Sequence, residues 1–329
     1  MREGLPVMIF DLKDHNDFLH SAFEIFRLQS EYNIIYKDFI KNLGRSHSNT
    51  RELADLPFLP VELFRNHIIV TGESTPELIF ESSRTTAMEA SRHYVTDRGV
   101  YETSFLTCFR LFYGDPAGYL VAALLPSYAE RRNSSLIYMT DRLIKESKNA
   151  ESGFYRDNQE LMISRLQSAA SSGKKSILLG VSFALMDLAE KYSPDLSVTI
   201  IMETGGMKGR RKEITRDEMH GFLKTKFNVS EIHSEYGMTE LMSQAYSKGS
   251  GIFQCPPWMR VMIRDIHDPL TVITEPGITG GINIIDLANI NSCSFIATSD
   301  LGRLRADGGF EVLGRFDNSD VRGCNLLTG

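Results

Sequence analysis

The chain has 329 residues, 42% of them hydrophobic and 24% charged, and a formal net charge of −6 at pH 7. A chain of this length can bury a large core, and the composition is that of an ordinary globular protein. The negative net charge gives no general attraction to the phosphates of nucleic acids or anionic lipids, so nucleic acid is not expected as a partner.

Neither a membrane span nor a secretory signal is expected. No apolar run reaches the roughly 18 residues of a membrane-spanning helix, and the opening MREGLPVMIFDLKDHND has acidic side chains too early for a signal peptide. The cysteines are scattered without a CxxC pair, which argues against a disulfide framework and against a structural zinc site: Cys108, Cys255, Cys293 and Cys324. The sequence therefore predicts a cytoplasmic protein.

The first predicted elements are helices. Residues 15–44 carry apolar side chains at helical spacing and end at Gly44, which predicts one or two amphipathic helices. A proline-bearing connection follows at 56–64. Residues 77–95 have the pattern of a short apolar strand, a hydroxyl-rich loop and a helix, so a strand-to-helix turn is expected at 81–87.

The middle of the chain alternates between strand and helix patterns. Within 174–192, and again within 196–227, an apolar strand pattern is followed by a turn and a helix pattern. Thr215 and Glu218 have the spacing of a capping box at the start of the second helix. This alternation predicts a largely parallel sheet covered by helices, with ligands at the carboxyl ends of its strands.

The last third of the chain is predicted to be mostly β. After about residue 255, short apolar segments are joined by glycine, proline and aspartate turns. The segment RADGGFEVLGR predicts a hairpin. No internal repeat and no linker long enough to require a separate domain occurs in the sequence.

Four hydroxyl side chains gather in the expected turn at 81–87: Ser82, Ser83, Thr85 and Thr86. Hydroxyls and free backbone N–H groups in a strand-to-helix turn can hold an anionic phosphate. The same hydroxyls can instead cap the helix that follows. This stretch by itself leaves both interpretations open.

The segment SEYGMTEL combines four groups that a nucleotide site uses. Tyr236 offers a flat face to a purine, Gly237 permits close approach of the backbone, Thr239 offers a hydrogen bond to a phosphate, and Glu240 is a potential Mg²⁺ ligand. Glycine and threonine are also ordinary turn and cap residues. The motif alone therefore does not decide between the two roles.

Two acidic segments lie near the carboxyl end. In ATSDLGRL, Asp300 follows an apolar strand pattern, where a carboxylate can accept both hydroxyls of a ribose or simply stabilise a turn. In GRFDNSDVRGCNLL, the charged side chains either belong to a site or form a surface network of little energetic value: Arg315, Asp317, Asp320 and Arg322.

The order of these motifs resembles that of the adenylate-forming superfamily of acyl- and aryl-CoA ligases, and within it the LuxE-type acyl-protein synthetases. The matching segments are the hydroxyl loop, YGMTE, TSD and GRFDNSD, supported by LPFLPVELF, LLPSYAERRNSSLIYM and EPGITGGINIIDLA. The resemblance implies an α/β fold of layered parallel and mixed sheets with helices, a β-rich C-terminal subdomain and no lid domain. It divides the chain into a domain at 1–316, β-rich from about 255, and a hinge-like tail at 317–329.

The resemblance implies ATP and Mg²⁺ as cofactors and a carboxylic acid, expected to be a fatty acid, as substrate. The acid would become an acyl-adenylate, and the acyl group would pass to a protein cysteine. The implied roles are adenine stacking by Tyr236, α-phosphate binding by Thr239, Mg²⁺ binding by Glu240, and ribose and nucleotide contacts by Asp300 and Arg315. The remaining implied nucleotide-binding residues are Ser82, Ser83, Arg84, Thr85, Thr86, Gly205, Gly206 and Gly237.

The phosphate loop departs from the family pattern. Such loops have approximately Ser-Ser-Gly-Thr-Thr-Gly, and here Arg84 and Ala87 stand at the two glycine positions. Arg84 either contacts a phosphate directly or blocks the close approach of the backbone and marks a site without turnover. Two alternatives follow: a relative that binds a nucleotide or an acyl-protein partner without catalysis, and an acyltransferase that needs no ATP.

The segment RGCNLL suggests an acyl acceptor. CoA ligases continue beyond the GRFD hinge into a lid domain, whereas LuxE-type proteins are short and pass the acyl group to a cysteine near their carboxyl end. Cys324 has that position, and the alternative is that it is a small packing side chain. The family acts beside an acyl-CoA reductase, so that enzyme or another acyl-acceptor protein is an expected partner. His93 and His233 either contact the substrate or are structural.

Overall fold

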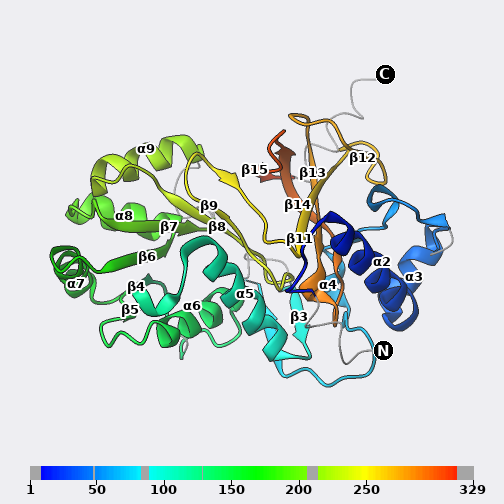
Figure 1. The fold of residues 1–329 in the computed structure, drawn as a ribbon, viewed down its shortest axis with the longest axis horizontal. Coiled ribbons are helices and arrows are strands. Elements are labelled where there is room, and N and C mark those ends of the chain that lie inside the picture. The colour runs from blue at the N-terminus through cyan, green and yellow to red at the C-terminus, as the bar shows by residue number, and fades with distance from the viewer. Residues whose placement is uncertain (1–8, 47–48, 83–88, 128, 206–213, 317–329) are drawn as a thin grey trace. The chain divides into compact units, whose positions relative to one another are not determined.

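The computed structural model describes residues 9–46, 49–82, 89–127, 129–205 and 214–316, whose path is drawn in Figure 1. The chain forms two compact units. The split unit contains residues 1–75 and 257–329, and the middle unit contains residues 76–256. Among the described residues, none of the helices has both the length and the apolar character needed to cross a membrane.

The middle unit contains a six-stranded sheet with the strand order β5-β4-β6-β7-β8-β9. The first five strands of this order are parallel, and β9 is antiparallel to β8. Their bounds are Gly153–Phe154 for β5, Tyr119–Leu124 for β4, Lys175–Val181 for β6, Thr199–Thr204 for β7, His233–Tyr236 for β8 and Ala245–Ser247 for β9. The short strand β10 is Ile252–Phe253. Every residue of β4 is buried, as expected for a parallel strand covered on both faces.

Helices follow the strands of this sheet in the order that the sequence predicts. Strand β6 leads into α8 and β7 leads towards α9, whose first turn has the capping box of Thr215 and Glu218. Leu178 and Ile201 of the strands share one hydrophobic core with Leu188 of α8. The helix bounds are Arg98–Tyr113 for α5, Ser135–Glu146 for α6, Gln159–Ser171 for α7, Ser182–Tyr192 for α8 and Arg216–Phe227 for α9, with a 3-10 turn η3 at Pro116–Gly118.

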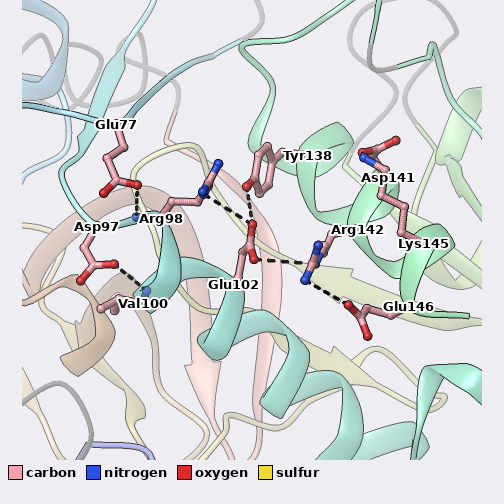
Figure 2. A network of polar contacts seen from close by, with 10 residues as sticks. All are labelled: Glu77, Asp97, Arg98, Val100, Glu102, Tyr138, Asp141, Arg142, Lys145 and Glu146. Carbon is pink, nitrogen blue, oxygen red and sulfur yellow. Dashed lines mark hydrogen bonds and ion pairs between the residues drawn. The ribbon is translucent and has the colours of Figure 1, made fainter.

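Glu102 connects α5 to α6 through a polar network (Figure 2). Its Oε1 accepts a hydrogen bond of 2.6 Å from the Tyr138 hydroxyl, and its Oε2 lies 3.7 Å from Nε of Arg142. Nε of Arg98, one turn before Glu102 on α5, lies 3.9 Å from Oε1 of Glu102. Because both arginines are partly exposed, each ion pair contributes little by itself, and the partly buried end of the network is the hydrogen bond between Glu102 and Tyr138.

A two-stranded hairpin, β2 (Leu78–Glu81) with β3 (Arg92–Val95), brackets the hydroxyl loop. The helix predicted to follow this loop within 77–95 is wrong at 92–95, because these residues pair with β2, and the next helix begins only at Arg98. Burial alternates along β3, with His93 and Val95 buried and Arg92 exposed. This alternation is the period of a β-strand. Residues 92–95 are therefore a strand and not a helix because they pair with β2.

The split unit joins the first helices of the chain to its last strands, which are the blue and the orange-red elements of Figure 1. Its sheet has the order β15-β14-β13-β11-β12, and β1 pairs in parallel with β14. The bounds are Leu59–Pro60 for β1, Met259–Arg264 for β11, Val272–Ile273 for β12, Thr279–Asp286 for β13, Phe295–Leu304 for β14 and Phe310–Arg315 for β15. The predicted hairpin RADGGFEVLGR is the β14–β15 turn together with β15.

Two helices cover residues 15–42, α2 (His15–Tyr32) and α3 (Ile34–Asn42). The break falls at Asn33, whose side chain accepts the Tyr36 N–H and caps α3. The Tyr36 ring stacks on Phe295 of β14 with centroids 5.9 Å apart, and the amide of Gln29 donates to the carbonyls of Asn289 and Ile290. The remaining short elements are η2 at Leu53–Asp55, α4 at Leu63–Asn66 and η4 at Leu287–Asn289.

Candidate functional site

In the middle unit, two of the predicted nucleotide segments leave neighbouring parallel strands at the same edge of the sheet. Strand β7 ends at Thr204 and is followed by Gly205, while β8 ends at Tyr236 and is followed by Gly237. The strands are in register, with Thr204 opposite Glu235. The carboxyl edge of a parallel sheet is the usual place for a ligand, so Gly205 and the 237–240 loop lie where the sequence predicts them.

His93 attaches the β2–β3 hairpin to this loop. Its Nδ1 lies 2.9 Å from the carbonyl oxygen of Thr239, which can only accept, so Nδ1 carries the proton. The side chain is 1% exposed. At the base of the same hairpin, the Ser82 hydroxyl accepts the N–H of Ser91 at 2.9 Å. The segments that flank the hydroxyl loop are therefore joined to the YGMTE loop.

The side chains of the YGMTE loop differ in exposure. Gly237 is exposed and Thr239 is half-buried, whereas Tyr236 and Glu240 are buried. The Tyr236 hydroxyl lies 3.7 Å from the sulfur of Met238, and its ring meets Phe253 edge to face at 5.9 Å. An exposed glycine between two fixed side chains leaves backbone open for a ligand to approach.

A carboxyl group that the sequence did not single out lies beneath the loop. Glu235 is buried on β8 and accepts a hydrogen bond from the Thr204 hydroxyl of β7. A methyl group at residue 237 would collide with its Oε1. Burial raises the pKa of Glu235 to about 7, with the Glu203 charge adding to the effect and the Thr204 hydrogen bond opposing it. The only sequence signal for Glu235 was an acidic residue within a strand that is otherwise mostly buried.

A second buried carboxylate supports the end of β7. Glu203 accepts a hydrogen bond of 2.9 Å from Ser182, whose hydroxyl also contacts the carbonyl of Gly205. Arg216 and His220 of α9 lie 3.7 and 3.6 Å from Glu203 Oε1. Burial alone would raise the pKa of Glu203, but these partners outweigh it and hold the pKa below its usual value. Gly205 has φ +66°, a conformation that favours glycine.

In the split unit, Asp300 and Arg315 face each other across β14 and β15. Nε of Arg315 lies 3.2 Å from Oδ1 of Asp300. The arginine side chain is 74% exposed, whereas the aspartate side chain is 9% exposed. The TSD and GRF motifs, 15 residues apart, thus form a cation–carboxylate pair whose arginine is open to solvent.

His233 occupies the start of β8, three residues before Tyr236, where its Nδ1 lies 3.2 Å from the Tyr113 hydroxyl. Burial, and then the charge of Lys248, lower its pKa. Its role in substrate binding stays a prediction. The predicted residues Ser83, Arg84, Thr85, Thr86, Gly206 and Cys324, with Ala87 and the rest of the 317–329 tail, lie outside the described residues.

Two of the three described cysteines have packing rather than nucleophilic character. Cys108 and Cys293 are fully buried, and Cys255 is half-buried. Burial raises the pKa of the Cys293 thiol to about 12, far from the range in which a thiolate forms at neutral pH.

No group of three or more His, Cys, Asp or Glu side chains with metal-site geometry occurs among the described residues. Mg²⁺ usually takes one or two protein carboxylates and completes its shell with water and substrate phosphates. Glu240, in the loop that follows β8, fits an ion that arrives with a nucleotide. It does not fit a metal caged by protein alone.

The fold matches solved structures although the sequence has diverged. An ATP-bound RpMatB-BxBclM chimera (TM-score 0.54, 14% identity) and ATP-bound MatB from Rhodopseudomonas palustris (TM-score 0.53, 13% identity) each align with 74% of this chain and 49% of their own. A double mutant of o-succinylbenzoate CoA synthetase (MenE) from Bacillus subtilis, bound with a product analogue, gives a TM-score of 0.50 at 17% identity, over 74% and 50%. No family model and no curated protein matches the sequence.

These identities are low, so the likeness concerns the fold. The chain spans about half the length of the proteins it matches. The predicted fold class, layered parallel and mixed sheets with helices and a β-rich C-terminal part, is confirmed. The chain has the fold of the adenylate-forming enzymes.

Proposed function

We propose that the chain activates a carboxylic acid, preferentially a fatty acid, with ATP and Mg²⁺, and passes the acyl group to a protein cysteine. One observation carries the proposal: the YGMTE loop leaves the carboxyl edge of a parallel sheet beside Gly205, with its Thr239 carbonyl bonded to the buried His93. The structural neighbours support it, because two of them are ATP-bound.

The proposal gives each of the following site residues a defined role. Thr239 binds the α-phosphate with its hydroxyl while its carbonyl is held by His93, and Tyr236 flanks the adenine. Asp300 accepts the ribose hydroxyls, and Arg315 holds the aspartate and contacts the nucleotide. Glu240 would hold Mg²⁺, which when bound neutralises part of the phosphate charge.

The chemistry has two steps. A carboxylate oxygen of the acid attacks the α-phosphorus of ATP, and the bond to the β-phosphate oxygen breaks, which gives an acyl-adenylate and pyrophosphate. The thiolate of Cys324 then attacks the acyl carbon, and AMP leaves with the bonding electrons. A thioester retains enough reactivity to pass the acyl group to a reductase or another acceptor protein.

The first experiment separates the two steps. Purified protein is incubated with ATP, Mg²⁺ and radiolabelled fatty acids of graded length, and pyrophosphate release and protein-bound label are measured. Cys324→Ser should still release pyrophosphate when hydroxylamine traps the adenylate, but should carry no thioester. Cys255→Ser, which removes a half-buried cysteine, is the matched control and should label like the parent chain.

A second candidate function rests on Arg84 and Ala87, which replace the loop glycines. A chain that binds ATP by calorimetry but releases no pyrophosphate with any acid would be a nucleotide-binding relative without turnover. A chain that binds no ATP but accepts label from a preformed acyl thioester would be an ATP-independent acyltransferase. If neither binding nor acylation occurs, all three functions are refuted.

A further inference from the structure

Strand β14 bulges at the TSD motif. Its pairing with β13 joins Ala297 to Asn283 and Leu301 to Gly281, so residues 298–300 lie opposite Ile282 alone. Bulges interrupt the ladder, redirect side chains and are frequent beside active sites. The interruption leaves backbone groups of the motif without their ladder partners, and another group has to satisfy them.

For the Thr298 carbonyl that group is Arg264, whereas the Asp300 N–H donates to the Thr298 hydroxyl. Nη2 of Arg264 donates to the carbonyl of Thr298 at 2.5 Å, and its Nη1 donates to the carbonyl of Ile282 at 2.7 Å and to Oδ1 of Asn283 at 2.9 Å. The arginine is the last residue of β11, so its side chain crosses β13 to reach β14. The planar guanidinium bridges both sides of the bulge, which a single-point donor cannot do.

Gly281 makes this crossing possible. A Cβ atom at residue 281 would lie 2.5 Å from the guanidinium carbon of Arg264, closer than real Cβ contacts. The glycine is therefore required for close approach of a side chain and not for its own conformation. Arginine and glycine form a matched pair on adjacent strands.

The same guanidinium reaches the second motif of the split unit. Its Cζ lies 5.3 Å from the centroid of the Phe316 ring, and the Phe316 N–H donates to the carbonyl of Ser299 at 2.9 Å. Phe316 follows Arg315 directly. The group that fills the TSD bulge therefore also packs against the GRF segment, a contact of cation–π type.

Filling the bulge does not by itself require a positively charged side chain. The residue is 9% exposed, and its three hydrogen bonds go to neutral oxygens. Burial lowers its pKa, while the carboxylates of Glu62 and Asp300 oppose this change. A buried cation is costly unless nearby negative charge compensates it, so the electrostatic partners of Arg264 include the predicted ribose ligand.

We propose that Arg264 is a positioning residue for Asp300: it fills the β14 bulge, ties the TSD motif to Phe316 and so fixes the carboxylate that receives the ribose hydroxyls. The inference rests on the proposed nucleotide-binding function. Arg264 acts through Asp300 and touches no substrate atom itself.

The test measures recognition of the ribose. Calorimetry compares ATP with 2′,3′-dideoxyATP, which lacks both ribose hydroxyls, for the parent chain and for Arg264→Met, Arg264→Lys, Asp300→Asn and Val261→Ala. Methionine has a side chain of similar length to arginine but carries no charge and no hydrogen-bond donor. Lysine keeps the positive charge but lacks the forked donors of the guanidinium. Val261→Ala removes buried volume from the same strand and leaves the bulge intact.

The parent chain should prefer ATP, and Asp300→Asn should reduce that preference by about tenfold, the value of one hydrogen bond to a charged group. Arg264→Met should reduce it almost as much, Arg264→Lys by an intermediate factor, and Val261→Ala not at all. The double variant Arg264→Met with Asp300→Asn should lose little beyond Asp300→Asn alone.

An unchanged preference in Arg264→Met, or an equal loss in Val261→Ala, would overturn the inference. Circular dichroism checks folding, and if Arg264→Met does not fold, Arg264→Lys decides: full preference in that variant overturns the role of the guanidinium fork. A parent chain that binds no ATP refutes the proposed function. A parent chain that binds ATP while the variants keep the preference refutes only the role of Arg264.

Discussion

Nδ1 of His93 and the carbonyl oxygen of Thr239 lie 2.9 Å apart although 146 residues separate them in the chain. The bond joins the hairpin that carries the hydroxyl loop to the loop that carries the predicted phosphate and Mg²⁺ ligands. A buried hydrogen bond between two segments fixes their relative position, which the proposed nucleotide site would require.

Replacing His93 with Phe should therefore weaken nucleotide binding as well as folding. Phe fills a similar volume but cannot donate to the Thr239 carbonyl, so the free energy of unfolding should fall by about 1–3 kcal/mol, and the Kd for ATP should rise. Denaturant titration and calorimetry measure the two effects. Val95→Ala is the control, because Val95 is buried on the same strand and has no bond to the loop. An ATP affinity equal to that of Val95→Ala would show that the bond is only structural.

Glu235 should make stability depend on pH. Its folded-state pKa of about 7 lies above the ordinary value of 4.5, so the folded chain binds the proton more tightly than the unfolded chain does. This contribution is fully present below pH 4.5 and is lost as pH rises through 7, by on the order of 3 kcal/mol. Glu235→Gln, which stays neutral and can still accept from Thr204, should remove that slope.

Denaturant titrations of the two chains at pH 5 and pH 8 measure this effect. The difference between the chains isolates Glu235 from the other titratable groups of the protein. The variant should be the more stable chain at pH 8. Parallel stability profiles for the two chains would contradict a neutral Glu235 in the folded state.

Gly237 should not tolerate a methyl group. Alanine at this position meets Oε1 of Glu235, and the side chain cannot retreat easily because Thr204 holds its other oxygen. Gly237→Ala should lower both the melting temperature and ATP affinity, and adding Glu235→Ala should restore part of the stability. Gly221→Ala in α9 is the control: nothing lies within 4 Å of its Cβ, so it should be neutral or stabilise by about 0.5–1 kcal/mol. Equal melting temperatures for both alanine variants would refute the clash.

Arg315 should matter for binding far more than for folding. Its ion pair with Asp300 has a 74% exposed arginine side chain, so Arg315→Gln should change the free energy of unfolding by less than about 1 kcal/mol. Loss of its charge beside the nucleotide should raise the Kd for ATP by about tenfold, as for a hydrogen bond to a charged group. Chemical denaturation and calorimetry on the same samples give both values. If Arg315→Gln loses much stability while its Kd for ATP is unchanged, Arg315 is a structural residue and not a nucleotide contact.

Features that depend on near neighbours in the chain were predicted from the sequence. The capping box at Thr215 and Glu218, the strand and helix pairs within 174–227 and the β14–β15 hairpin all form as expected. Hydrophobic periodicity and cap residues determine such elements, because the contacts that stabilise them span only a few residues.

Features that depend on distant partners were not predicted. Residues 92–95 become a strand because β2 pairs with them. The importance of Glu235 and Arg264 comes from burial and from a bulge, neither of which leaves a local pattern. The sequence by itself determined the fold class and the order of the predicted nucleotide-binding motifs. Only the tertiary structure decided that His93 meets Thr239, and that the first helices pack with the last strands, since these contacts need segments more than a hundred residues apart to be brought together.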